Sequence, residues 1–139
     1  MYNGDFITKA FFEIDKNLTI LKKRQGVTKE QLENETELLW ILAHGLQLTV
    51  QALIDIGTHI LSEIGNERWE KYSEIPELLN KHNIISVTSS KSFIEMVRMR
   101  NILAHEYFFL DTEKVANVIN NNLDDVPKIL YEYRSYLQL

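Results

Sequence analysis

The sequence predicts an all-α fold, an up-and-down bundle of about five helices in a single domain over residues 1–139. Three observations support this class. Apolar residues recur three and four positions apart in several long segments, which is the period of a helix with one buried face. Residue types that cap helices (Ser, Thr, Asp and Gly) stand at the ends of these segments. Runs of β-branched residues, which favour strands, are absent apart from residues 84–88.

The composition is that of a globular domain with a substantial core. The chain has 139 residues, of which 45% are hydrophobic. It has no cysteine, which excludes disulfides and thiolate metal ligands, and we expect a cytoplasmic location. The start, Met1–Asp5, lacks the features of a signal peptide, and no apolar run approaches membrane-spanning length, so we expect no membrane association. A net charge of −5 argues against broad binding of nucleic-acid backbones but allows a small cationic site.

The first predicted helix covers about residues 6–25, with Asp5 as its cap and Gly26 as its stop. Its buried face is predicted from apolar residues that recur at a spacing of three and four: Ile7, Phe11, Ile14, Leu18 and Leu21. The cations at residues 22–24 fit the end of a helix, where positive charge is favoured, better than they fit an RNA contact.

A long helix over about residues 35–64 should form the centre of the fold. Capping boxes at Thr28–Gln31 and Asn34–Glu37 predict a short helical turn and then this helix, which Gly65 closes. Its middle is so apolar that it must be buried on most sides or pack against a second subunit. Gly45 and Gly57 would allow other helices to approach it closely.

A polar stripe interrupts this helix at a spacing of three or four residues: His44, Gln47, Gln51, Asp55 and His59. Asp55 and His59 are metal-ligand types, but two ligands do not make a metal site, so we expect no metal. A hydrogen-bonded network in the core or at a dimer interface explains the stripe better.

The second half of the chain predicts several shorter elements. A polar connection carries Trp69 and Tyr72, which either stack on RNA bases or, more commonly, cover a small core. Ser73 should begin a short helix to about residue 80, and further helices are expected over about 91–109, after Asp111, and over about 124–137. The three asparagines at 120–122 predict a break before the last helix.

Arg100 lies where a helix would place a buried apolar residue. On a helical wheel it falls near the middle of the face formed by Phe93, Met96, Val97, Leu103 and Ala104. A guanidinium group is always charged and is costly to bury without a partner. We therefore expect Arg100 either to pair with an internal carboxylate, for which Asp55 is the candidate, or to line a cleft that receives an anion.

Arg100 begins the octet Arg-Asn-Ile-Leu-Ala-His-Glu-Tyr, which ends at Tyr107. Asn101 and His105 are four residues apart and share a face with Arg98, so we expect Arg98 to support the group. Tyr107 lies almost in line with Arg100, two turns further on. From the helix pattern alone, an internally paired arginine beside a satisfied histidine explains the octet as well as a phosphate site does.

The octet resembles the signature of HepT-like proteins in the HEPN superfamily. The segments 51–57 and 72–79 and the helical tail extend this resemblance over nearly the whole chain. The resemblance implies an all-helical homodimer and a metal-independent endoribonuclease toxin that requires no cofactor. It also implies a small nucleotidyltransferase antitoxin as partner, which adds AMP to the motif tyrosine, here Tyr107.

The residues of the octet suit the cleavage of RNA. RNA carries its own nucleophile, the 2′-hydroxyl, so the protein must supply acid–base catalysis and stabilise charge on the phosphate. His105 has a side chain that titrates near neutral pH, Arg100 can grip phosphate oxygens, and Asn101 can orient either group. On an ideal helix Arg100 and His105 point about 140° apart, so they converge only if the Arg side chain curls round, the helix distorts or two subunits face each other. We favour the dimer, because it supplies two copies of His105, one as base and one as acid.

Two other functions remain open at this point. A HEPN-like helical dimer without catalytic activity could bind a nucleotidyltransferase or a nucleotide, and the acidic net charge favours this alternative slightly. A purely structural helical protein would need Arg100 and His105 only for stability. The intact set of Arg100, Asn101, His105 and Tyr107 favours the enzyme.

Overall fold

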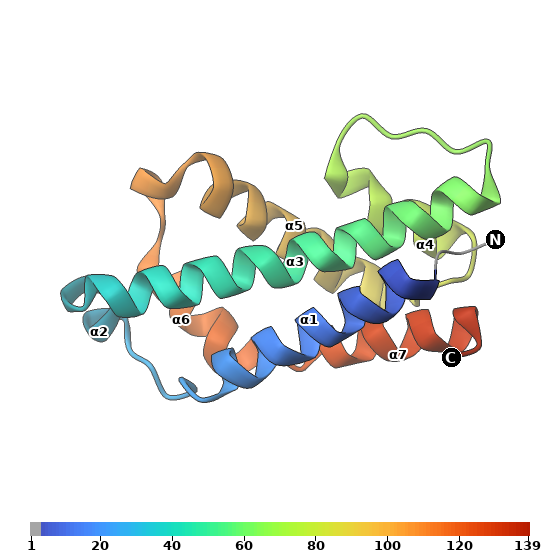
Figure 1. The fold of residues 1–139 in the computed structure, drawn as a ribbon. Coiled ribbons are helices and arrows are strands. Elements are labelled where there is room, and N and C mark those ends of the chain that lie inside the picture. The colour runs from blue at the N-terminus through green and yellow to red at the C-terminus, as the bar shows by residue number, and fades with distance from the viewer. Residues whose placement is uncertain (1–3) are drawn as a thin grey trace.

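The chain folds as an up-and-down bundle, seen in a computed structural model that describes residues 4–139. Its four long helices are α1 (Gly4–Lys22), α3 (Thr36–Ile64), α5 (Val87–His105) and α7 (Asp125–Leu137), and they alternate in direction along the bundle (Figure 1). Within the described residues, the short helices α2 (Lys29–Asn34), α4 (Ile75–Lys81) and α6 (Thr112–Asn117) raise the number of α-helices to seven, against the five expected. The expectation for the extreme N-terminus falls mostly on residues 1–3, outside the described part.

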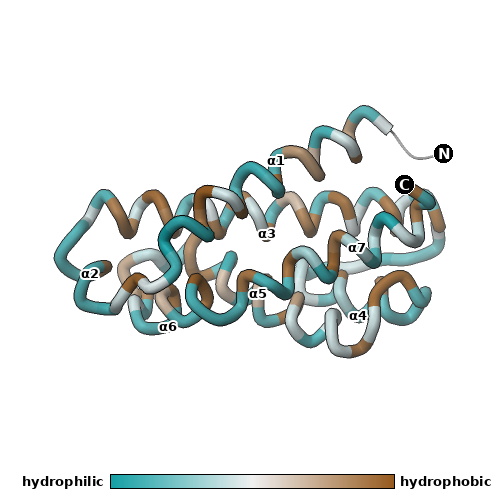
Figure 2. The backbone as a smooth tube through the Cα atoms, turned by 90° about the horizontal axis from the view of Figure 1, so that it is seen from below, coloured by the Kyte–Doolittle hydropathy of each residue, from teal (hydrophilic) through white to brown (hydrophobic). Residues whose placement is uncertain are grey.

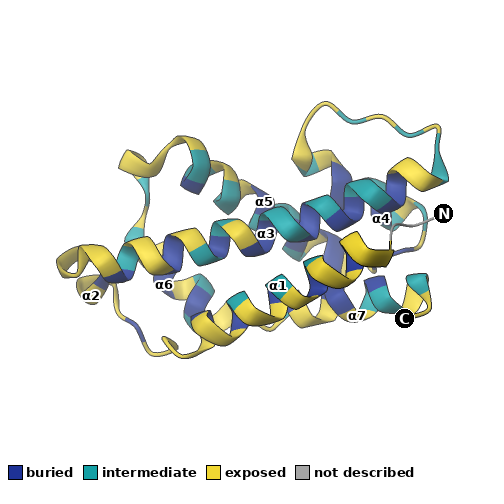
Figure 3. Cartoon of the chain, viewed as in Figure 1, coloured by how far each residue is buried: buried dark blue, intermediate teal, exposed yellow. Residues whose placement is uncertain are grey.

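Helix α3 is the centre of the bundle, as predicted. It packs against α1, α4 and α5, and α5 packs in turn against α7. Its middle and second half are largely buried (Figure 3), and hydrophobic and hydrophilic residues alternate along each long helix (Figure 2). In length and apolar composition α3 could cross a membrane, which corrects our expectation that no apolar run approaches that length. In this fold it is a core helix, and 44% of its most apolar window is buried.

Both glycines of α3 lie at close contacts between helices. A Cβ atom at Gly57 would lie 3.0 Å from Leu79 Cδ1 of α4 and 3.0 Å from the hydroxyl oxygen of Tyr133 of α7. That hydroxyl donates a hydrogen bond of 2.9 Å to the carbonyl of Leu53, and Tyr133 is fully buried. At Gly45, a Cβ atom would lie 3.0 Å from Leu21 of α1. The prediction that these glycines permit close approach is confirmed.

The predicted caps are confirmed in part. Thr28 forms a complete capping box with Gln31, whose backbone N–H donates to the threonine hydroxyl at 3.1 Å. The second predicted box is wrong, because Glu35 is the N-cap of α3 and its side chain makes no capping hydrogen bond. Gly26 and Gly65 have φ values of +98° and +81°, which glycine adopts without strain. Gly65 caps α3 as expected, whereas α1 ends at Lys22, four residues before its predicted stop at Gly26.

The break predicted at the three asparagines is a π-helical turn, η3 (Val118–Asn122). Asn120 in this turn accepts a hydrogen bond of 2.6 Å from the backbone N–H of Gly26. It also donates one of 2.8 Å to the carbonyl of Val27. The loop between α1 and α2 is thereby fixed to the segment that leads into α7.

Helix α5 is displaced towards the N-terminus from its predicted range of 91–109. It begins after Ser86, whose hydroxyl accepts a hydrogen bond of 3.1 Å from the backbone N–H of Ser89. The carboxylate of Glu132 in α7 accepts the backbone N–H of Ser86 at 2.6 Å and also the hydroxyl of Ser89. A negative side chain at the first turn of a helix is favourable, so α7 helps to set where α5 begins.

The other end of α5 is also earlier than predicted. The helix ends at His105, and Glu106 has φ −132° and ψ 38°, outside the helical region. A 3₁₀ turn, η2 (Tyr107–Phe109), follows. Tyr107 therefore does not continue the helix of Arg100, and its predicted alignment with Arg100 is wrong.

Candidate active site

Arg100 is half-buried near the end of α5 and is held by three contacts. Its Nε donates a hydrogen bond of 2.9 Å to the side-chain oxygen of Gln51 in α3. Its NH1 donates one of 3.1 Å to the side-chain oxygen of Asn101. The centre of its guanidinium group lies 5.2 Å from the ring centroid of Tyr72, in the 3₁₀ turn η1 (Tyr72–Glu74), which is a cation–π distance. Three elements thus fix this group before any substrate is present.

The predicted direct pair between Asp55 and Arg100 is wrong, because Gln51 lies between them. The amide nitrogen of Gln51 donates a hydrogen bond of 2.8 Å to Asp55, while its oxygen accepts from Arg100. Residues 51 and 55 are one helical turn apart, so the chain Asp55–Gln51–Arg100 follows from the polar stripe of α3. Arg98 stands apart from this chain, because its side chain is exposed and pairs with Glu95 of the same helix.

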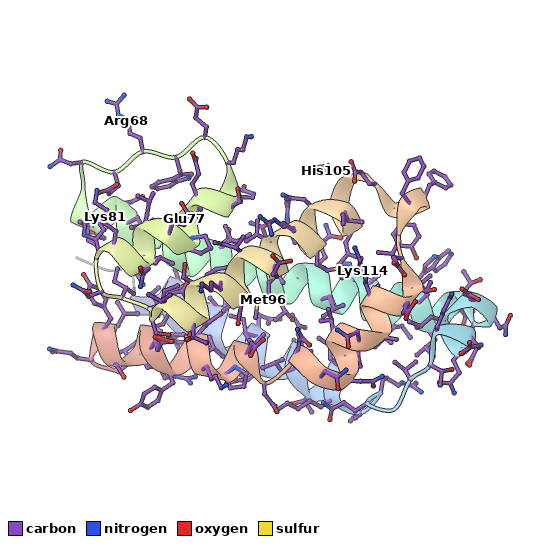
Figure 4. All side chains as sticks on the ribbon, turned by 180° about the vertical axis from the view of Figure 1, so that it is seen from behind. Arg68, Glu77, Lys81, Met96, His105 and Lys114 are labelled. Atoms are coloured by element: carbon purple, nitrogen blue, oxygen red, sulfur yellow. The ribbon has the colours of Figure 1, made fainter. Side chains whose placement is uncertain are left out.

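His105 is the last residue of α5 and is exposed. It lies at the outer end of that helix, next to the turn η2 (Figure 4). Arg100 and Asn101 are joined to each other by a hydrogen bond. Among the described residues, no hydrogen bond joins His105 to either of them. One copy of the chain therefore brings Arg100 and Asn101 together and leaves His105 free to meet a substrate or a second subunit.

Tyr107 lies in η2 with 37% of its surface exposed. It borders a shallow pocket whose other lining residues are Trp40, Ala43, His44, Gln47 and Leu103. Partial burial raises the pKa of its hydroxyl above the ordinary value, so the phenol keeps its proton near neutral pH. Phe108 and Phe109, which follow it, are 100% and 84% exposed. The turn after the octet is thus a protruding aromatic segment.

A larger pocket than that of Tyr107 lies apart from the octet. It is bounded by α3, α5, α6 and η3, and Met96 and Met99 of α5 contribute to its wall. Figure 4 shows Met96 on α5 and Lys114 on the neighbouring α6. Lysine and acidic side chains are mixed around it. Within residues 4–139, no three histidine, aspartate or glutamate side chains gather to form a metal site.

Sequence reasoning missed the roles of Gln51 and Tyr72. Gln51 belongs to the polar stripe recognised in α3, and its spacing of four from Asp55 was the available signal. Tyr72 was considered only as a base-stacking residue or a lid. The lid interpretation fits Trp69, which is half-buried against the core. Arg68 beside it points away from the bundle (Figure 4).

Comparison with known proteins identifies the family. The family described as Ribonuclease HepT-like matches residues 14–132. A tRNA nuclease HepT of Aphanizomenon flos-aquae is 31% identical over 89% of this chain and 84% of its own length. An mRNA nuclease HepT of Shewanella oneidensis is 31% identical over 61% of this chain and 64% of its own length.

A solved structure agrees with the fold. The tri-AMPylated HEPN toxin of Shewanella oneidensis, in complex with its MNT antitoxin, superposes with a TM-score of 0.85 at 23% identity. That alignment covers 96% of this chain and 99% of the toxin. The family match extends from α1 to α7 and includes the whole octet with its supporting residues in α3 and η1. The chain belongs to the HepT-like ribonuclease family.

Proposed function

We propose that this chain is a metal-independent endoribonuclease toxin that cleaves tRNA or mRNA with Arg100, Asn101 and His105. The observation that carries the proposal is the fixed guanidinium of Arg100, five residues before an exposed His105 on the same helix, in a member of a ribonuclease family. Relatives that act on tRNA and on mRNA set the substrate class. We expect the protein in the cytoplasm, where both RNAs are found.

The reaction we propose uses the 2′-hydroxyl of the RNA as nucleophile. His105 takes the proton of that hydroxyl, and the 2′-oxygen attacks the adjacent phosphorus. The bond from phosphorus to the 5′-oxygen breaks, and an acid returns a proton to that oxygen. Arg100 and Asn101 stabilise the extra negative charge on the phosphate in the transition state. The products are a 2′,3′-cyclic phosphate and a 5′-hydroxyl end.

A second subunit would supply the acid. We propose a homodimer formed across the exposed apolar surface of Trp40, Ile41, Leu48, Phe108 and Phe109, which are 44% to 100% exposed. Soluble monomers rarely expose so many large apolar side chains, which makes this surface a candidate interface. Phe108 and Phe109 follow His105 by three and four residues, so a symmetric dimer formed through them would bring two copies of that histidine near each other.

Control by an antitoxin would act on Tyr107. The structurally similar Shewanella toxin carries AMP and is bound to its MNT antitoxin, and we propose a nucleotidyltransferase partner of that type here. The hydroxyl of Tyr107 would give its proton to a base of the partner as its oxygen attacks the α-phosphorus of ATP, and the bond from that phosphorus to pyrophosphate would break. The added AMP would bring bulk and negative charge to the turn that begins two residues after His105, so both sterics and repulsion would exclude RNA.

Cleavage of tRNA and mRNA by the purified protein in chelator, beside His105→Ala, tests the proposal. We expect the wild type alone to cleave and to leave 2′,3′-cyclic phosphate ends. The intact mass of the protein is measured in parallel, because AMP on Tyr107 would silence the enzyme. An unmodified wild-type protein that cleaves neither RNA would contradict the nuclease and favour the alternative, a non-catalytic dimer that binds a nucleotidyltransferase or a nucleotide.

A further inference from the structure

We propose that Gln51 is a positioning residue that fixes Arg100 without neutralising its charge. This inference rests on the proposed nuclease function. Gln51 is the only residue that links the carboxylate of Asp55 to the guanidinium of Arg100 in the described structure, through hydrogen bonds of 2.8 Å and 2.9 Å. Its position 49 residues before Arg100 means that the contact exists only when α3 and α5 have packed together.

Asp55 determines which way the amide of Gln51 points. An ionised carboxylate only accepts hydrogen bonds, so it selects the NH₂ end of the amide. The carbonyl end must then face Arg100, which only donates. With Asp55 present, the reversed amide would place oxygen against oxygen and nitrogen against nitrogen. The carboxylate therefore acts on Arg100 indirectly, by holding the orientation of the group that touches it.

The amide also leaves the charge of Arg100 available. A carboxylate in direct contact would form an ion pair with the guanidinium and compete with the phosphate for it. A neutral amide occupies Nε only, and Asn101 takes one hydrogen of NH1. Tyr72 covers one face of the planar group. Among residues 4–139, no other side chain hydrogen-bonds the NH2 edge or the remaining NH1 hydrogen, so they can bind two phosphate oxygens in a fixed geometry.

A double variant that exchanges the amide and the carboxylate between positions 51 and 55 distinguishes this role from a merely structural one. The double variant Gln51→Glu/Asp55→Asn keeps the net charge and the shape of both groups, but it moves the carboxylate into contact with Arg100. We expect kcat/KM for tRNA cleavage to fall about 10²-fold, as for loss of a transition-state donor, with an unchanged melting temperature. Gln51→Leu should lower kcat about tenfold by loosening Arg100.

A charge control completes the experiment. Gln47→Glu adds a carboxylate one turn earlier in α3, where no hydrogen bond to Arg100 exists. It measures the electrostatic effect of a nearby negative charge that does not contact the guanidinium. We expect at most about a threefold loss from this partly screened charge. An exchange variant as active as the wild type, or no more affected than Gln47→Glu, would overturn the proposal.

NMR of the Arg100 Nε–H group tests the positioning without any cleavage assay. We expect slow hydrogen exchange of this group in the wild type and fast exchange in Gln51→Leu. Equal exchange in the two proteins would overturn the role of Gln51. If the wild type cleaves no RNA but its Nε–H is protected by Gln51, the nuclease function fails while the positioning contact stands.

Discussion

The two halves of α5 differ in what holds them. The first half is anchored by the fold: Ser89, Ser90, Phe93 and Val97 are buried, and Glu132 of α7 accepts hydrogen bonds from its first turn. The second half carries Arg100, half-buried and held by side chains of α3 and η1, and then an exposed end at His105. The same helix is therefore a packing element at one end and a chemical element at the other.

Helix α3 repeats this division. Near α4 and α7 it carries the fully buried residues Leu53, Ile54, Ile56 and Ile60. Near the end of α5 it exposes Trp40, Ile41 and Leu48. The buried end of α3 thus supports an end whose exposed side chains can contact RNA or a second subunit. Substitutions in the buried part of α5 or α3 should therefore affect stability, whereas substitutions in the exposed part should affect RNA cleavage or dimer formation.

Arg100→Ala should have the largest effect on activity and little effect on stability. We expect kcat/KM for RNA cleavage to fall by about 10²–10³, while the free energy of unfolding changes by less than about 1 kcal/mol. Activity is measured with tRNA and stability by denaturant unfolding. Arg98→Ala is the control on the same helix, because its side chain is exposed and pairs only with Glu95. Equal losses in both variants would remove the special role of Arg100.

Phe93→Ala should do the opposite. Phe93 is fully buried in the first half of α5, so its loss should lower the free energy of unfolding by about 3–5 kcal/mol through the cavity left behind. Any molecules that remain folded should keep a working site, since the octet lies two turns away. Denaturant unfolding gives the first quantity and activity per folded molecule gives the second. A loss of specific activity greater than the loss of folded protein would mean that the two halves are coupled.

Gly57→Ala tests the close contact of α3, α4 and α7. The added Cβ would lie 3.0 Å from both Leu79 and the hydroxyl of Tyr133, so the neighbours must move apart. We expect a loss of about 1–3 kcal/mol from overpacking, against which the better helix propensity of alanine is a smaller gain. Gly4→Ala is the control, because nothing lies within 4 Å of its Cβ position. If Gly57→Ala stabilised the protein, Leu79 and Tyr133 would have moved apart at little cost in free energy.

Phe109→Ser should have the smallest effect on the stability of a monomer. Its side chain is 84% exposed in η2, so we expect a change in the free energy of unfolding of less than about 0.5 kcal/mol at low protein concentration. The same variant should weaken a dimer formed across this surface, which light scattering over a range of concentrations measures. A strongly destabilised monomer would mean that η2 belongs to the core, which would contradict the division between buried and exposed parts of the molecule.

Much of the fold was predictable because helix periodicity and capping are local properties. The buried face of α1, the extent of α3 and the capping box of Thr28 all followed from short stretches of sequence. The start of α5 was not predictable in this way. Ser86, Ser89 and Ser90 are all good N-caps, and a carboxylate 43 to 46 residues later in the chain favours the first of them.

The site was predictable in its members and less so in its contacts. The wheel indicated that Arg100 needs a partner, and Asp55 was the candidate, yet a sequence pattern cannot distinguish neighbours one turn apart on α3. Gln51 therefore took the place assigned to Asp55. Tyr72 could not be assigned at all, because the path of the connection over residues 65–71 determines where it lies. The roles of Asn101, His105 and Tyr107 stay predictions, of which the cleavage assay tests His105.

The contact between Glu132 and the start of α5 has a consequence for synthesis on the ribosome. Translation proceeds from the N-terminus, so residues 100–107 are made well before Glu132. A nascent chain then already carries the complete octet, but its helix lacks the carboxylate that accepts Ser86 and Ser89. The finished helix must wait for the last segment of the chain. An incomplete chain, whether stalled or truncated before α7, therefore lacks the anchored helix that holds the octet.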